Sequence, residues 1–182
     1  MEVLIIAGSP RTDSQSLRVS RILENYLRDY SVLTPTVLNL AAQPTGPQRD
    51  ELAGRAEAFI VVVPEHSGMA PPVLKEFFVS SEYPVLAHKP ALIVSISSGM
   101  GGSYPVLDLR ATTYKNTKIC YMPDHLIIRE VEDFGPDMSS RAYAGLGKRI
   151  SACVHMLELY ARQLSAVRAD LLGVGAAITY GM

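Results

Sequence analysis

Short, mostly apolar runs alternate along the chain with longer segments in which apolar residues recur every three or four positions. A strand buried on both faces of a sheet reads as a continuous apolar run, because neither face needs polar side chains. The sequence therefore predicts five strands, and it predicts an irregular connection over 123–137. The five runs are Val3–Ala7, Thr36–Leu40, Phe59–Val63, Pro90–Ser97 and Lys118–Met122.

The segments between these runs carry helical periodicity. The first helix is predicted to start at Asp13 or Ser14, either of which can cap it, and to continue to Tyr30. One short helix at most is expected in 41–57. Further helices are expected over 70–81, with prolines in the first turn, over 103–116 and over 140–164. Strands that alternate with helices predict an α/β fold, a doubly wound parallel sheet of five strands in a three-layer α/β/α sandwich. The common strand order for such a sheet is 2-1-3-4-5.

Length and composition fit one globular domain over 1–182. The chain has 182 residues, of which 48% are hydrophobic and 19% charged. Its formal net charge of −1 offers no basic surface for nucleic acid or for an anionic membrane. The same near-zero charge also argues against a dedicated electron carrier that docks through an acidic face.

Cysteine and histidine usage excludes several classes of site. Cys120 and Cys153 are far apart and form no CxxC, so they are expected to be free thiols in a reducing compartment. The apolar start is too short for a signal peptide, and no run approaches the ~20 residues that span a bilayer. We therefore expect a cytoplasmic protein. The four histidines lack metal-ligand spacing, and no serine lies in GxSxG, so neither a metal site nor a hydrolase triad is expected.

Three loops rich in polar residues and glycine follow strands that should be neighbours. They are GSPRTDSQS after the first strand, PEHSGM after the third and SSGMGGS after the fourth. In a doubly wound sheet, loops at the carboxyl ends of adjacent strands share the crevice where the strand order reverses. The sequence therefore predicts one site built from these loops.

The first loop favours an anion. Ser9, Thr12, Ser14 and Ser16 can donate hydrogen bonds, Arg11 can pair with a phosphate, and the loop runs into a helix N-terminus. An ordinary turn with a serine cap remains the alternative. The loop matches neither GxxxxGK[ST] nor GxGxxG, which argues against a nucleoside triphosphatase and against a dinucleotide fingerprint. The glycine-rich loop 97–102 would let backbone approach a flat ligand, or would be only a flexible turn.

Taken in order and spacing, these three loops resemble the NADPH-dependent FMN reductases of the flavodoxin-like fold, a family that includes quinone, chromate and azo-dye reductases. The family patterns are approximately GSxRxxSxN, PEYNGSxPGVLKN and SxGxxGG, and the likeness covers about residues 2–120. This chain has Ser16 where the family has Asn, His66 where it has Tyr, and Ser67 where it has Asn. Pro72 replaces a Gly.

The resemblance implies a set of FMN-binding residues. The phosphate would be held by the first loop, through Ser9, Arg11, Ser14, Gln15 and Ser16. The ribityl chain and the ring edge would be lined by Pro64, Glu65, His66, Ser67 and Gly68. The ring would be closed from the other side by Ser98, Gly99, Gly101 and Gly102.

The resemblance also implies an activity. Electrons would pass from NADPH or NADH through bound FMN to a small acceptor, such as a flavin or a quinone, in a ping-pong cycle. No classical catalytic side chain is expected, although His66 could tune the flavin or merely replace a packing Tyr. A homodimer or homotetramer is expected, with the apolar tail 171–182 packed on the body or at a subunit interface. Two alternatives are a non-catalytic FMN-binding electron carrier and a family member that lost flavin and serves a binding or regulatory role.

Overall fold

Five parallel strands run through the centre of the structure, a computed structural model that describes residues 1–176. Their order is β2-β1-β3-β4-β5, and each neighbouring pair is parallel. The strands are β1 (Glu2–Ala7), β2 (Thr34–Asn39), β3 (Ala58–Pro64), β4 (Pro90–Ile96) and β5 (Cys120–Ile128). The predicted doubly wound sheet and its order are confirmed.

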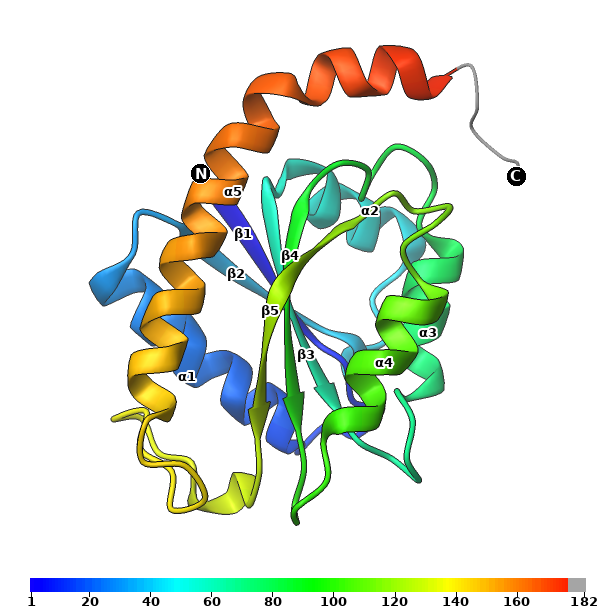
Figure 1. Cartoon of the computed structure of the whole chain (residues 1–182). Helices are drawn as coiled ribbons and strands as arrows, with labels where there is room; N and C mark the ends of the chain where they lie inside the picture. The colour runs from blue at the N-terminus through cyan, green and yellow to red at the C-terminus, as the bar shows by residue number, and fades with distance from the viewer. Residues whose placement is uncertain (177–182) are drawn as a thin grey trace.

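Helices cover both faces of this sheet, so the molecule has three layers (Figure 1). One face carries α1 (Gln15–Tyr30) and α5 (Leu146–Gly175). The other face carries α2 (Gly46–Arg55), α3 (Pro72–Ser80) and α4 (Ser103–Thr112). Two short 3-10 helices, η1 (Leu40–Ala42) and η2 (Val131–Asp133), follow β2 and β5. None of the helices in residues 1–176 combines the length and the apolar character that crossing a bilayer requires.

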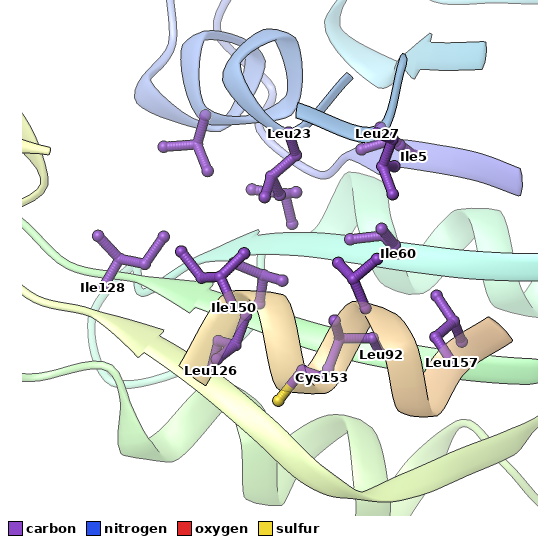
Figure 2. Close-up of a cluster of buried hydrophobic side chains, with 14 of the residues drawn as sticks. Ile5, Leu23, Leu27, Ile60, Leu92, Leu126, Ile128, Ile150, Cys153 and Leu157 are labelled. Carbon is purple, nitrogen blue, oxygen red and sulfur yellow. The ribbon is translucent and has the colours of Figure 1, made fainter. Parts of the chain in front are cut away.

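Alternate residues of the central strands enter two different cores. In β1, Val3 and Ile5 pack toward α1 and α5, whereas Leu4 and Ile6 pack toward α2, α3 and α4. Figure 2 shows the first core, in which Cys153 of α5 lies among aliphatic side chains. Both cysteines are free thiols, as predicted. Burial on both faces explains why these strands contain almost no polar residue.

The predicted end of the fifth strand was wrong. The strand does not stop at Met122 but continues to Ile128, through the segment that was expected to be irregular. Pro123 led to the early end, because a proline cannot donate to a sheet ladder. Here β5 is an edge strand, and its register against β4 shifts between Ala91 and Ile93, so the missing N–H falls where the ladder is already interrupted. The extension places His125 and Ile127 in the strand, toward its carboxyl end.

The last helix also differs from its predicted bounds. It starts at Leu146 rather than Ser140, because Asp137 Oδ1 accepts hydrogen bonds from the N–H and the hydroxyl of Ser139 and holds a turn there. It continues past Leu164 to Gly175, which lies against Tyr83 of the body. Of the tail that was expected to pack on the body or on a partner, residues 171–175 are therefore helical, and 177–182 lie outside the described residues.

Candidate functional site

The loops after β1, β3 and β4 meet in a pocket of about 370 Å³ at the carboxyl edge of the sheet. This pocket is called the loop pocket below. The predicted residues that line it are Ser9, Arg11, Ser14, Gln15, Ser16, Pro64, Glu65, His66 and Ser98. The predicted residues that do not line it are Ser67, Gly68, Gly99, Gly101 and Gly102. Parallel strands place these loops at one edge, although the first and last loops are almost ninety residues apart in the chain.

Two serines of the first loop shape the entry into α1. Ser14 is the N-cap, and its hydroxyl accepts the N–H of Leu17 at 3.2 Å. The buried Ser9 hydroxyl accepts the N–H of Arg11 at 3.1 Å. The residue before Ser9 must be glycine, because a Cβ at Gly8 would lie 2.9 Å from Leu74 Cδ2 and 3.0 Å from the Val62 carbonyl oxygen. The capping interpretation and the ligand interpretation of this loop are thus compatible.

Ser16 has a different environment. It is only 1% exposed, it lines the loop pocket, and its hydroxyl has no hydrogen-bond partner in the described part of the chain. A buried hydroxyl without a partner costs free energy, so its presence calls for an explanation. Ser16 lies in the first turn of α1, where free N–H groups and the helix dipole favour an anion. A phosphate in the loop pocket would supply the missing acceptor, so this part of the site fits FMN.

The loop pocket is not a cluster of cations. Among the residues that line it, only Arg11 is a lysine or arginine. Three lining residues carry carboxylates, namely Asp13, Glu65 and Glu132. Glu65 accepts the N–H of Gly102, and Glu132 accepts the Ser98 hydroxyl at 3.1 Å. A phosphate here would therefore be stabilised mainly by N–H groups, hydroxyls and the helix dipole, with a single guanidinium beside it.

The loop after β3 forms a tight hairpin. His66 and Met69 exchange two backbone hydrogen bonds of 3.0 Å, and the residues between them, Ser67 and Gly68, have φ values of 49° and 75°. Two consecutive positive φ values define a type I′ turn, which favours Asn-Gly. Ser67 and Gly68 therefore shape the turn, and of the hairpin residues 66–69 it is His66 that lines the loop pocket.

Glu65 joins the loop after β3 to the glycine-rich loop after β4. Its Oε2 accepts the Gly102 N–H at 2.6 Å, and a Cβ at Gly101 would lie 2.7 Å from its Oε1. Gly102 has φ of 103°, and a Cβ there would lie 2.5 Å from Ile127 Cγ2. From the other side, Arg129 Nε donates to the carbonyls of Met100 and Gly101 at 2.7 and 3.1 Å. The two glycines thus serve close packing of the loop.

His66 is half-buried and lines the loop pocket together with Arg11 of the first loop. Burial lowers its pKa, and the nearby Arg11 guanidinium lowers the pKa further. A histidine whose pKa falls below 6.5 is mostly neutral at pH 7. His66 is therefore mainly an uncharged imidazole at neutral pH.

Arg18 was not predicted from the sequence as a site residue, and it holds a segment that lines the loop pocket. From the first turn of α1, the half-buried Arg18 donates to Gln15 Oε1 at 2.5 Å, to the Phe134 carbonyl at 2.6 Å and to the Val131 carbonyl. These bonds fix η2, which brings Val131 and Glu132 to the loop pocket. Helix α1 carries several arginines, and nothing in the sequence distinguishes Arg18 from the others as the one that holds η2. In residues 1–176 no group of three or more His, Cys, Asp and Glu side chains is arranged to hold a metal ion.

Comparison with solved structures supports the fold. FerB, a flavoenzyme NAD(P)H:(acceptor) oxidoreductase from Paracoccus denitrificans, superposes with a TM-score of 0.73 and 17% identity, covering 89% of this chain and 97% of that one. The apo NADH:FMN oxidoreductase EMOB gives 0.69 and 13%, covering 87% and 88%. An NADPH-quinone reductase from P. pentosaceus gives 0.57 and 19%, covering 90% and 98%. At these identities the likeness establishes the fold alone.

Comparison at the level of sequence gives the family. A search of curated proteins finds no match. The family model described as NADPH-dependent FMN reductase matches residues 1–133, which include β1 to η2 and all the residues of the loop pocket. The chain therefore belongs to the NADPH-dependent FMN reductase family of oxidoreductases.

Proposed function

We propose that this protein binds FMN in the loop pocket and transfers electrons from NADPH or NADH to a small acceptor. The observation that carries the proposal is the Ser16 hydroxyl, buried and unpartnered at a helix N-terminus that opens into the pocket. The free N–H groups and the dipole of a helix N-terminus favour an anion such as a phosphate. The family match and the convergence of three loops support the same cofactor.

Different residues would contact different parts of the cofactor. The phosphate would lie against the first loop, near Ser9, Arg11 and Ser16, while Pro64 and His66 would line the remainder. When bound, FMN supplies the redox chemistry, accepting electrons from the nicotinamide donor and releasing them to the acceptor. The protein contributes binding and orientation, with the Glu65–Gly102 hydrogen bond holding two loops at a fixed separation. We propose that donor and acceptor use the same place in turn, which makes the kinetics ping-pong.

The first test is whether the protein takes up FMN and whether NAD(P)H reduces it. Purified protein mixed with FMN and desalted is expected to keep the visible absorbance band of flavin. The band should disappear when NADPH or NADH is added without oxygen, and it should return when a quinone or free flavin is added. A protein that stays yellow with both donors would be an electron carrier. A protein that retains no FMN would contradict both readings and favour a binding or regulatory role.

Replacing His66 with Phe tests whether the imidazole tunes the flavin. A cation near the ring stabilises the negative charge of reduced flavin and raises the reduction potential. Burial and Arg11 lower the pKa of His66, so the wild-type potential should exceed that of His66→Phe by an amount that grows as the pH falls and the imidazole gains a proton. At higher pH, where the imidazole is neutral with either form of the flavin, the difference should be constant. Potentials measured from pH 5.5 to 8 check this, and equal pH slopes would leave His66 only a packing role.

An exposed apolar stripe suggests the subunit contact. Tyr104, Leu107 and Tyr114 follow one side of α4 and its end, and Met100 of the adjoining loop is also exposed. The stripe begins at the glycine-rich loop, so a second copy packed there would wall the loop pocket. We infer a homodimer, or a homotetramer that contains this dimer. Leu107→Glu is expected to give monomers in sedimentation equilibrium, whereas an already monomeric wild type with bound FMN would refute the contact.

A further inference from the structure

A second pocket lies at the outer edge of the sheet, between β5 and the start of α5. It measures about 350 Å³ and is called the β5 pocket. Its polar lining comes from the part of the chain where the predicted strand and helix bounds were wrong. These side chains are His125, Arg129, Ser140, Tyr143 and Arg149.

The β5 pocket adjoins the glycine-rich loop that borders the candidate flavin site. Ile127, which also lines it, packs against Gly102. Arg129 holds the carbonyls of Met100 and Gly101 through its Nε. A substrate that reaches the flavin site could therefore extend one of its ends into the β5 pocket.

The lining side chains suit an anion with several oxygen atoms. Within residues 1–176 Arg129 donates hydrogen bonds only through its Nε, so its two terminal nitrogens have no acceptor there. Arg149 makes one 3.3 Å contact with Asp124, and these two side chains are 45% and 40% exposed. An ion pair this exposed contributes little, so Arg149 can exchange it for a ligand. Guanidinium groups bind phosphate oxygens in pairs, which gives both strength and orientation.

Two further features point to the same chemistry. The Nδ1 of His125 is buried and has no partner in the described part of the chain. The N-terminus of α5 has no side-chain cap, and Leu146 of its first turn lines the pocket. A phosphate placed here would meet a helix N-terminus, two guanidinium groups and an imidazole. Half-exposed Tyr143 adds an aromatic surface on which a heterocycle can stack.

We propose that the β5 pocket binds the phosphate monoester of a substrate whose reactive ring lies at the loop pocket. Two substrates of the proposed reaction carry such a group: NADPH, through its 2′-phosphate, and FMN acting as free acceptor. NADH and riboflavin lack it. The inference rests on the proposed function, and it adds a basis for discriminating between otherwise similar substrates.

The binding test uses protein saturated with FMN, so that the loop pocket is filled. Titration with 2′,5′-ADP and with inorganic phosphate is followed by calorimetry. Arg149→Gln is expected to weaken binding by about 10-fold. Arg149→Lys should weaken it less, because lysine keeps the positive charge but lacks the paired N–H donors of the guanidinium. Lys148→Gln is the matched control: it removes the same charge from the neighbouring exposed residue, which does not line the pocket, and should leave binding unchanged.

Kinetic ratios identify which substrate supplies the phosphate. A fall of about 10-fold in the NADPH-to-NADH ratio of kcat/KM in Arg149→Gln assigns the pocket to the donor. The same fall in the FMN-to-riboflavin ratio assigns it to the acceptor. If neither probe binds more weakly to Arg149→Gln than to Lys148→Gln, the site is refuted. Failure of the proposed function gives a different result: wild-type protein binds the probes, but NAD(P)H does not reduce its bound flavin. If the protein cannot be loaded with FMN, the same titrations are done on the protein as purified.

Discussion

Replacing Gly102 with alanine is expected to destabilise the fold by about 3 kcal/mol, through backbone strain of roughly 1–3 kcal/mol and overpacking of similar size. The φ of 103° is one that residues with a Cβ rarely adopt. The added methyl would also lie 2.5 Å from Ile127 Cγ2, so β5 or the loop must move. Movement of the loop would lengthen the 2.6 Å hydrogen bond from Gly102 to Glu65. Both the free energy of unfolding and the FMN affinity should therefore fall.

Gly99 provides the control in the same loop. A Cβ there has nothing within 4 Å, and its φ is not in the left-handed region. Gly99→Ala should change the free energy of unfolding by less than about 0.5 kcal/mol. Urea denaturation of both variants and of the wild type measures the difference. Equal stabilities for the two variants would show that the close approach of Gly102 to β5 is not a constraint on the protein.

Replacing Ser16 with alanine is expected to weaken FMN binding by about 10-fold, or roughly 1.4 kcal/mol, while leaving the unliganded protein as stable as the wild type or slightly more so. The reason is that its hydroxyl has no partner in residues 1–176, so its removal breaks no bond within them and relieves a desolvation cost. A phosphate, by contrast, would lose a hydrogen bond that its negative charge strengthens.

Ser14 is expected to show the opposite balance. Its hydroxyl caps α1 through Leu17, so Ser14→Ala should cost about 1 kcal/mol of stability before any ligand is added. Thermal unfolding of both variants without FMN, followed by flavin fluorescence titration, separates a capping serine from a binding serine. A Ser16→Ala variant that is less stable but binds FMN normally would assign the hydroxyl a structural role and remove the main support for the phosphate site.

The two pockets suggest a division of tasks around the glycine-rich loop. One side of this loop borders the candidate cofactor site and is held by Glu65. The other side is held by Arg129, which also lines the β5 pocket. A substrate bound through Arg129 would therefore contact the residue that positions the loop. The Arg149 variants test the β5 pocket alone, whereas Gly102→Ala also presses on Ile127, which lines that pocket.

The sequence by itself determined the layout of this protein. Apolar runs and helical spacing predicted the parallel sheet and its two covered faces, because each pattern depends on neighbours within about one turn or one strand pair. The strand order then placed the first, third and fourth loops at one edge, and the structure brings Ser16, Glu65 and Ser98 into one pocket there. Each of these inferences needs only local periodicity and the topology of parallel sheets.

Only the tertiary structure decided which side chains complete the sites. Pro123 is accommodated in β5 because that strand lies at an edge with a shifted register. Arg18 holds Phe134 across 116 residues of chain, and Glu65 holds Gly102 across 37. Neither residue differs in type from an ordinary surface charge, so its role depends on the acceptor or donor that folding places beside it. Long-range hydrogen bonds of this kind leave no period in the sequence. The sequence therefore predicted the fold and much of the lining of the loop pocket, but not the bonds of Arg18 and Glu65 or the β5 pocket.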